Sequence, residues 1–372
     1  MRIVAVNPFS RRDLLRFIKF PLLLYSSSQF YVPHLTYERM NFFNPRKNPF
    51  FRHASVEYYL ALSGKGEVIG RVTAHIDWNY VDYHTEKKGF FGFFDCVDNP
   101  DVARALLDRA SDSLREKGME GVIGPVSFST NDEVGILVKG FESPPSIMMP
   151  YNFRYYGRLL EECGFQKAKD LYAYFTEYDG TTPEAIVRVS ERMKRRTKVT
   201  LRKLDMKNFQ EDLKIVSRIY NSAWEDNWGF TPMSDDEVRY LGQNLKQIVD
   251  PEIVFFAYIA DRPVGFFIAI PDYNPVLKEL NGRLFPFGFL KLLGARKKLD
   301  RLRVLVMGVV DEYRRSGIES ALLEEIFRVG PENGYYKGEL SWILEDNVIM
   351  NKIISRIVKD PYKIYRVYER GL

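Results

Sequence analysis

The six residues RRSGIE, from Arg314 to Glu319, combine the residue types that hold a phosphate group. They follow an apolar stretch that ends at Val310 and precede the helical pattern SALLEEIF, so they form the turn between a strand and a helix. The first N–H groups of a helix have no intrahelical partners and lie at the positive end of its dipole. Gly317 permits a tight turn and close approach of a ligand, and Arg315 adds positive charge, as Arg314 does. The loop therefore predicts binding of a pyrophosphate.

The same loop offers a second explanation. Ser316 and Glu319 match the capping box S-x-x-E. In that motif Ser316 Oγ accepts a hydrogen bond from the Glu319 N–H, and the Glu319 carboxylate accepts one from the Ser316 N–H. Such a cap contributes about 1 kcal/mol and needs no ligand. The amides cannot fully serve both cap and phosphate, so a phosphate-binding loop and a self-capped helix both remain open hypotheses.

Two stretches with related patterns indicate an internal repeat. GEVIGRVTAHID (66–77) and DRPVGFFIAIPD (261–272) each predict a β-hairpin with a Gly-containing turn. Each half then continues through a strand into a helix and ends in an aromatic strand pattern, at 164–175 or 362–370. Strands and helices mixed in this order predict an α/β sheet in each half.

The strand-to-helix step is also repeated, but the first copy lacks the residues that would bind phosphate. At an offset of 216 residues the loop aligns with DNPDVA, which begins at Asp98. Asp98 and Asp101 stand where the second copy has Arg314 and Gly317, and Pro100 removes a donor N–H. Only the second copy is therefore expected to bind an anion.

The boundary between the halves lies near YDGTTPEAI (178–186) and is followed by the basic run RMKRRTKVTLRK. We predict an N-terminal domain at 1–180, a basic linker and first helix at 181–204, and a C-terminal domain at 205–372. The basic run fits either a solvated helix face or a surface that faces phosphate or RNA.

Composition limits the class of protein. With 372 residues the chain is long enough for two domains, and its 45% hydrophobic content excludes a disordered chain. The net charge of +5 permits acidic ligands without implying nucleic acid. Cys96 and Cys163 form no CxxC pair, and the four histidines show no ligand spacing, so we predict no metal and a reducing cytoplasm.

No apolar run approaches the roughly 20 residues of a membrane helix. The most apolar stretch near the N-terminus, FIKFPLLLY (17–25), fits a core or interface segment better than contact with a membrane surface.

The second half resembles the GNAT superfamily of acyl-CoA-dependent N-acyltransferases. The resemblance covers residues 205–372 and rests on the order of strand RVLVMGVV, loop RRSGIE, helix SALLEEIF and strand GELSWILEDN, which ends at Asn347. The whole chain is similar to tandem GNAT proteins with a diverged first copy. The resemblance implies an α/β (α+β) fold of two domains, each a mixed, mostly antiparallel sheet flanked by helices.

The resemblance also implies acetyl-CoA or another acyl-CoA as co-substrate and a small-molecule amine or amino acid as acceptor. By analogy, backbone N–H groups around Met307 to Val309 would hold the thioester oxygen, and Asn347 would open the next helix. The implied CoA-binding residues are Met307, Val309, Val310, Arg314, Arg315, Ser316, Gly317, Ile318, Glu319 and Asn347.

The sequence departs from the family pattern in its acid and base. The strand offers Leu305, Met307 and Val309 where the family often has a carboxylate, and Ile354 stands where it usually has a tyrosine. Glu345 is a candidate base or a helix cap. Candidate acids are Tyr365 and Tyr368, for which packing in the core is the alternative role.

The connection AWEDNWGFTPMSDDE borders the acceptor in the family. Its candidate acceptor-binding residues are Trp224, Glu225, Asp226, Trp228 and Phe230. The alternative is a buried aromatic loop followed by a helix capped at Ser234.

The leading interpretation is thus a cytoplasmic acyl-CoA-dependent N-acyltransferase. One alternative keeps the fold and uses aminoacyl-tRNA as donor. The other is a non-catalytic binding or scaffold protein, which the missing base and tyrosine would favour.

Overall fold

The computed structural model describes the chain from Met1 to Leu372 except Asp226, and of Leu293 it describes the backbone alone. The chain forms two compact units. The first comprises Met1–Leu171, Asn274–Leu293 and Lys363–Leu372, and the second comprises Tyr172–Tyr273 and Gly294–Tyr362. Two segments from the second half of the sequence therefore pack with the first unit.

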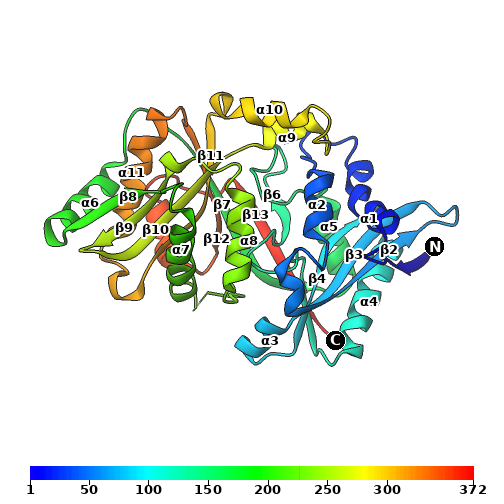
Figure 1. The fold of residues 1–372 in the computed structure, drawn as a ribbon. Helices are drawn as coiled ribbons and strands as arrows, with labels where there is room; N and C mark the ends of the chain where they lie inside the picture. Colours follow the sequence, from blue (N-terminus) through cyan, green and yellow to red (C-terminus); the bar gives the residue numbers. More distant parts are fainter. Residues whose placement is uncertain (226) are drawn as a thin grey trace. The chain divides into compact units, whose positions relative to one another are not determined.

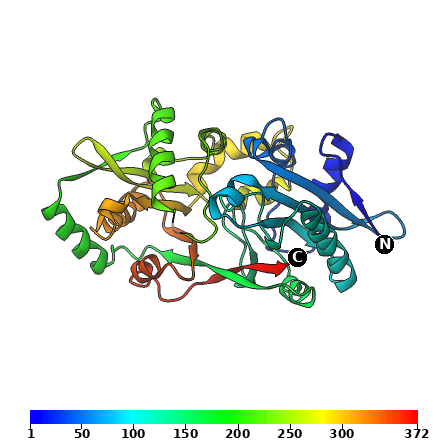
Figure 2. The ribbon, with the colours of Figure 1, turned by 90° about the horizontal axis from the view of Figure 1, so that it is seen from below.

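The first unit is built on strands in the order β1-β2-β3-β4-β5-β13, with β6 also paired to β13. Neighbouring strands run antiparallel except β4 and β5, which run parallel. The C-terminal strand ends among the elements of this unit, where the Leu372 N–H donates to the Glu120 carbonyl at 2.9 Å (Figure 2). Its elements are β1 (Arg2–Ala5), α1 (Arg11–Leu24), α2 (Thr36–Phe42), η1 (Pro49–Arg52), β2 (Ala54–Leu62), β3 (Val68–Asp77), α3 (Trp78–His84), β4 (Lys88–Cys96), α4 (Pro100–Glu116), β5 (Gly121–Gly124), β6 (Ile136–Lys139), α5 (Tyr155–Glu162), α9 (Asn274–Leu280) and β13 (Lys363–Gly371).

Helix α4 packs against β3 and closes the core of the first unit (Figure 1). Asn99 fixes its start, because the Asn99 side chain accepts hydrogen bonds from the N–H groups of Asp101 and Val102. Pro100 occupies the first turn, where a missing N–H costs nothing. The buried face of α4 comprises Val102, Ala103, Leu106, Leu107, Ala110 and Leu114.

The apolar N-terminal stretch is a core segment, as expected from the sequence. It forms the second part of α1, where Phe17 and Phe20 are buried, and the following Tyr25 is buried too. Leu23 points away from this core and is exposed.

The second unit contains strands in the order β12-β11-β10-β9-β8. Helices α6 and α11 pack against each other, and α7 packs against β10 and β11 (Figure 1). Its elements are α6 (Glu184–Arg196), β8 (Val199–Lys203), α7 (Phe209–Ala223), α8 (Asp235–Leu245), η2 (Pro251–Ile253), β9 (Val254–Ile259), β10 (Arg262–Pro271), η3 (Arg296–Lys298), β11 (Arg301–Val309), η4 (Asp311–Tyr313), α11 (Ile318–Glu332), β12 (Lys337–Leu344) and α12 (Val348–Ile354). Two further elements, β7 (Gln166–Glu177) and α10 (Gly288–Ala295), have residues in both units.

The repeat expected from the sequence is present, with one correction to its hairpins. The stretches 66–77 and 261–272 each form a single strand, β3 or β10, rather than a complete hairpin. Each strand pairs antiparallel with the strand before it, β2 or β9, so the hairpin turn lies at the start of each stretch, at Gly66 and at Asp261.

A buried polar network at the end of β4 ties the first unit together. The Asp95 carboxylate accepts hydrogen bonds from Tyr25 Oη at 2.7 Å, Tyr156 Oη at 3.2 Å and Arg71 Nε at 2.8 Å. Burial raises the pKa of the Tyr25 hydroxyl well above its ordinary value, and the Asp95 charge raises it further. The single Asp95 carboxylate therefore provides a hydrogen-bond acceptor for the side chains of Tyr25, Tyr156 and Arg71.

We predict that Asp95→Ala lowers the free energy of unfolding by about 3–5 kcal/mol, because it leaves the Arg71 guanidinium buried without its carboxylate. Urea unfolding followed by circular dichroism measures the change. Asp112→Ala removes an exposed carboxylate that pairs with Arg115 and should cost less than about 1 kcal/mol. A similar small change in both variants would contradict the structural role of Asp95.

Candidate functional site

Strand β11 is paired unequally on its two sides. Its antiparallel pairing with β10 extends to Val309 opposite Gly265. Its parallel pairing with β12 covers only Arg301 to Val304. Within the described part of the chain, β12 does not pair with β11 from residue 305 onward, which leaves that edge of β11 open toward β12.

The hydrogen-bond pattern shows which amides lie on this open edge. The Val310 N–H donates to the Val264 carbonyl at 2.9 Å. In an antiparallel ladder, successive residues direct their N–H and C=O groups to opposite sides. Gly308 therefore directs its groups toward β10, and Met307 and Val309 direct theirs toward the open edge. These are the residues for which the sequence predicts thioester binding.

Trp224 supports the strand at this point. A Cβ atom on Gly308 would lie 2.4 Å from Trp224 Cζ3, so only glycine lets the indole ring pack on the β11 backbone. The ring stacks on Tyr220, with 4.8 Å between ring centroids, and also packs near Phe266. Trp224 therefore supports β11 from the side of α7.

The other candidate acceptor-binding residues differ in how far they are buried. Phe230 is buried and packs on Tyr220, Trp228 is partly exposed, and Glu225 is exposed. Asp226 lies outside the described residues. The helix after this loop begins as the alternative interpretation expects, because Ser234 and Glu237 form a complete capping box at the start of α8. An acceptor-binding role for these residues stays a prediction.

The turn between β11 and α11 contains two residues with left-handed backbone, Arg315 with φ 64° and Gly317 with φ 102°. Gly317 is the N-cap of α11. A Cβ on Gly317 would lie 3.1 Å from atoms of Val189 and Met193 in α6, so the position favours glycine for both conformation and space. The helix thus starts against α6, as close packing of α6 and α11 requires.

One of the two hydrogen bonds of the expected capping box is absent, namely the one that Ser316 Oγ would accept. Gly317 rather than Ser316 is the N-cap, and Ser316 Oγ is buried without a hydrogen-bond partner in the described residues. The left-handed Gly317 moves the helix start one residue beyond Ser316, which places the hydroxyl out of reach of the Glu319 N–H.

Glu319 does fold back onto the loop. Its carboxylate accepts a long hydrogen bond of 3.5 Å from the Arg315 N–H. Burial raises the pKa of the Glu319 carboxyl, while the N–H groups of Glu319, Arg315 and Gly317 and the Arg314 charge oppose that rise. A carboxylate therefore lies at the amides that the sequence assigns to a pyrophosphate.

The two loop arginines have different surroundings. Arg314 pairs with Asp311 at 2.7 Å and donates to the Ala223 carbonyl at the end of α7. Arg315 is exposed. Arg315 is therefore the guanidinium more available to an incoming anion.

A buried polar cluster lies where β11 and β12 separate, and the sequence analysis did not identify it. Arg303 and Glu339 are register partners, and Ser341 follows the last paired position. Ser341 Oγ accepts from Arg303 Nε at 2.9 Å and donates to Glu339 at 2.5 Å, and Tyr362 Oη donates to the other Glu339 oxygen. In the sequence, the signal that could have identified this cluster is the presence of charged residues inside otherwise apolar strands.

The candidate acid and base residues lie in different environments. Glu345 follows β12 in a partly exposed turn, and Asn347 caps α12 by accepting from the Met350 N–H at 3.0 Å. Tyr365 and Tyr368 lie in β13 of the first unit and are buried. Burial raises the pKa of Tyr368 to about 12, and its hydroxyl donates to Glu161 at 3.2 Å. The catalytic roles of all three candidates stay predictions.

Four of the seven basic residues of the run 192–203 form ion pairs with carboxylates. Its ion pairs are Lys194–Glu324, Arg195–Glu191, Arg202–Asp212 and Lys203–Glu252. These pairs support the solvated-face interpretation, because they leave less positive charge for a phosphate backbone.

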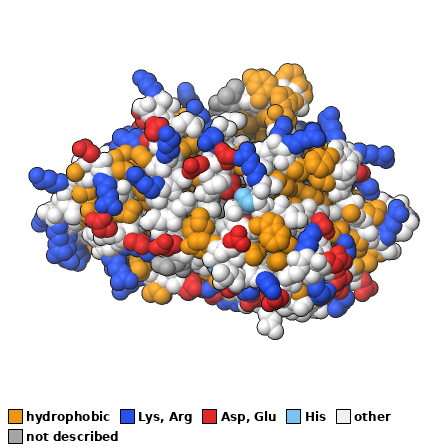
Figure 3. All heavy atoms as spheres, turned by 60° about the horizontal axis from the view of Figure 1, so that its bottom comes forward, with side chains coloured by type: hydrophobic (Ala, Val, Ile, Leu, Met, Phe, Trp, Pro, Cys, Tyr) orange, Lys and Arg blue, Asp and Glu red, His pale blue; other side chains and the backbone are white. Residues whose placement is uncertain are grey.

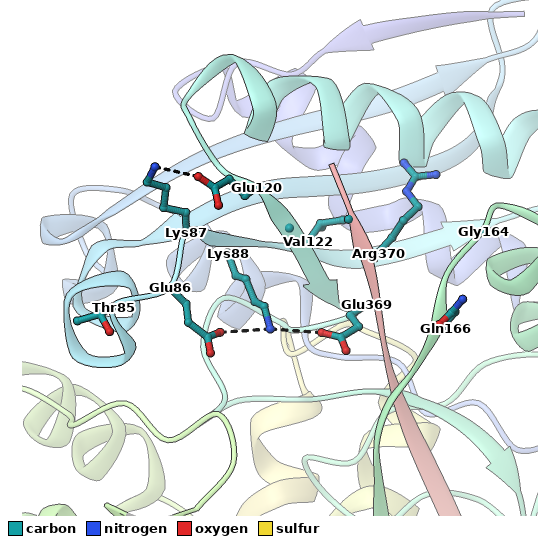
Figure 4. A pocket seen from close by; sticks show the side chains of 12 residues that line it. Thr85, Glu86, Lys87, Lys88, Glu120, Val122, Gly164, Gln166, Glu369 and Arg370 are labelled. Carbon is teal, nitrogen blue, oxygen red and sulfur yellow. Dashed lines mark hydrogen bonds and ion pairs between the residues drawn. The ribbon is translucent and has the colours of Figure 1, made fainter.

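A surface recess of about 690 Å³ in the first unit contains none of the predicted site residues (Figure 4). Two ion pairs join side chains that line it, Lys87 with Glu120 at 2.8 Å and Lys88 with Glu369 at 3.4 Å. Among the described residues no cluster of side chains could hold a metal ion, and no helix is long and apolar enough to cross a membrane.

Comparison with known proteins places these features in context. No family model matches the chain. The chain is 37% identical over 370 residues to the bacterial ceramide synthase of Caulobacter vibrioides, covering 97% of this chain and 95% of that protein. It is 35% identical over 370 residues to Protein YghO of Escherichia coli, covering 98% and 94%.

A solved structure of a tandem GNAT protein from the clavulanic acid biosynthesis pathway matches with a TM-score of 0.55 and 11% identity, over 100% of this chain and 98% of that chain. At this identity the likeness shows the fold alone. The expected tandem GNAT fold is confirmed.

We predict that Glu319→Gln stabilises the protein increasingly as pH rises. The pKa of the folded carboxyl is raised, so ionisation is less favourable in the folded state than in the unfolded state. The wild type therefore loses stability as pH rises from its ordinary pKa through the raised folded value, and glutamine does not.

Thermal unfolding at pH 4 and pH 7.5 tests this prediction. We expect Tm of Glu319→Gln to exceed that of wild type by roughly 2–4 °C at pH 7.5 and by less than about 1 °C at pH 4. Glu312→Gln, at an exposed carboxylate of the preceding turn, controls for the loss of one negative charge. An equal gain at both pH values would show that the raised pKa is not the cause.

Proposed function

The chain belongs to the same family as the bacterial ceramide synthase of Caulobacter vibrioides and Protein YghO of Escherichia coli, and we propose that it is an acyl-CoA-dependent N-acyltransferase. Ceramides are amides of a fatty acid and a long-chain amine. We therefore propose a fatty acyl-CoA as donor and a long-chain amine as acceptor, which narrows the small-molecule amine expected from the sequence.

The observation that carries the proposal is the open edge of β11. The N–H groups of Met307 and Val309 face this edge, while the other side of the strand is fixed by β10. Two fixed N–H groups can stabilise the oxyanion that forms when an amine attacks a thioester. An unpaired strand edge also offers hydrogen bonds to the amides of a pantetheine arm.

The proposed reaction forms one C–N bond and breaks one C–S bond. The acceptor ammonium loses one proton, and the neutral amine nitrogen attacks the thioester carbonyl. The nitrogen of the tetrahedral intermediate loses a second proton as the intermediate expels CoA thiolate, which takes up a proton. We assign proton removal to Glu345, the partly exposed carboxylate that follows β12.

Binding of the CoA phosphates requires Glu319 to leave the helix start. A pyrophosphate would accept hydrogen bonds from the N–H groups of Arg315 and Gly317, which now interact with the Glu319 carboxylate. The exposed Arg315 guanidinium would pair with the phosphate oxygens. Val310, Ser316 and Ile318 complete the loop that we propose to enclose the pyrophosphate.

One observation favours a second candidate function. The Glu319 carboxylate itself interacts with the amides of the loop, as a self-capped helix would require. The second candidate is therefore a binding protein of GNAT fold that no longer uses CoA. The aminoacyl-tRNA alternative has no such observation in its favour.

We place the reaction in the cytoplasm. CoA thioesters are made there, and the two cysteines, Cys96 and Cys163, are buried and free.

We predict that the purified protein releases CoA from a long-chain acyl-CoA only when a long-chain amine such as sphinganine is present. A thiol reagent measures CoA release, and mass spectrometry detects the N-acyl amide. Arg315→Glu should lower kcat/KM for acyl-CoA at least tenfold, because it replaces a cation near the phosphates with an anion.

Asp101→Lys is the matched control, since it changes an exposed charge in the corresponding loop of the first copy, and it should leave kcat/KM within about twofold. If the protein binds acyl-CoA but forms no product with any amine, the result would contradict acyl transfer and would still support the proposed acyl-CoA-binding site. If acyl-CoA gives no thermal stabilisation of folded protein, the binding-protein candidate replaces the enzyme.

A further inference from the structure

The connection between β10 and β11 is much longer than its counterpart in the first copy. It runs over 29 residues, 272–300, whereas β3 and β4 are joined by ten residues, 78–87. The long connection contains α9, α10 and η3 and is drawn in yellow in Figure 1. The GNAT-like sheet does not require this extra length, because the first copy forms the same strand pair without it.

The first part of the connection is firmly anchored in the first unit. Asn274 is buried and donates from Nδ2 to the Pro145 carbonyl at 2.7 Å, and Leu280 is buried. The Gly282 carbonyl accepts from the Thr36 N–H at 3.0 Å. The connection therefore has a fixed base.

The next part places large apolar side chains in solvent. Phe285 is 64% exposed, Phe287 73%, Phe289 41% and Leu290 55%. Phe285 contacts the exposed Tyr37 ring edge-on, with 5.9 Å between ring centroids. Hydrophobic side chains project over this region at the upper margin of Figure 3, with Lys and Arg side chains beside them. Exposed apolar groups of this size mark contact surfaces in soluble proteins.

The charge of the same stretch has one sign. Residues 281–299 contain five basic residues and no acidic residue. Lys291 pairs with Glu279 and Arg296 with Asp250. Arg283, Lys297 and Lys298 are exposed and have no ion-pair partner in the described part of the chain.

We propose that residues 283–298, the docking segment, bind the protein to the surface of an anionic lipid bilayer. The phenylalanine and leucine side chains would enter the acyl region, and the flanking Arg and Lys side chains would pair with lipid phosphates. Helix α10 has eight residues, so it can lie in the interface and cannot span a bilayer that needs about 20.

Charge complementarity selects this occupant. A second copy of the chain would bring the same positive segment to a symmetric contact, where like charges repel. An anionic bilayer instead offers acyl chains and negative phosphates at the same interface. The inference rests on this surface alone and stands apart from the proposed enzymatic activity.

Vesicle flotation tests the proposal with the full chain. Wild type is expected to float with vesicles of phosphatidylcholine containing phosphatidylglycerol and to bind pure phosphatidylcholine at least tenfold more weakly. The double variant Phe285→Ser and Phe287→Ser should reduce binding to the anionic vesicles at least tenfold. The double variant Lys297→Glu and Lys298→Glu should reduce it by a similar factor.

A matched control removes two exposed aromatic side chains elsewhere on the first unit. Trp78→Ser with Tyr83→Ser, both in α3, should leave vesicle binding within about twofold of wild type. Circular dichroism and thermal unfolding establish that every variant is folded.

Failure of folded wild type to bind anionic vesicles would overturn the proposal. Equal loss in the α3 control, or equal binding to pure phosphatidylcholine, would overturn the assigned segment or its charge dependence. Sedimentation velocity distinguishes another occupant. A wild-type dimer that Phe285→Ser and Phe287→Ser converts to a monomer, without vesicle binding, would identify a self-association surface instead. CoA release measured without vesicles reports the enzymatic proposal separately.

Discussion

The unequal pairing of β11 is the constraint on which the candidate site depends. The strand keeps its ladder with β10 to Val309 but leaves β12 after Val304, so one edge stays open while the other holds the strand in the sheet. Trp224 packs on the strand at Gly308, where any side chain would block the indole. The same strand leads through a short turn into α11. The amides that we propose as donors for a thioester oxygen and for a phosphate are thus positioned along one continuous segment.

The two copies satisfy their helix starts by different chemistry. In α4 the neutral Asn99 side chain caps the first N–H groups at 2.9 Å and 3.3 Å, and Pro100 removes one of them. In α11 a carboxylate reaches back from inside the helix, its contact with the Arg315 N–H is long, and burial raises its pKa. The Asn99 cap is local and carries no charge to desolvate. The Glu319 cap instead places at the start of α11 a carboxylate whose charged form burial disfavours.

The sequence predicts much of this arrangement because its signals are local. The loop before α11, the Asn347 cap and the capping box at Ser234 depend on residues within a few positions of one another, and the fold class and the repeat follow from the order of such local patterns along the chain. The predicted Ser316 cap is wrong because the left-handed backbone of Gly317 shifts the helix start, and a capping motif does not encode that shift.

Features that depend on distant pairing could not be predicted in this way. The cluster of Arg303, Glu339, Ser341 and Tyr362 joins residues up to 59 positions apart through strand register and the return of the chain after α12. Likewise, β13 reads as the last strand of the second half, yet it pairs with β5 and β6 of the first unit. Burial of Tyr365 and Tyr368 follows from that pairing rather than from their spacing in the sequence.

The docking segment and the open strand edge are linked by the chain itself. Nine positions separate Lys298 from Met307, so the two lie at most about 30 Å apart along an extended backbone. This bound is similar to the thickness of the hydrocarbon core of a bilayer, about 30 Å. If the segment lies at a membrane surface, the path of an amine from the lipid headgroups to a thioester held at β11 is no longer than about this bound. Long-chain substrates permit movement along this path, because their apolar chains can remain against lipid or protein while the polar amine advances.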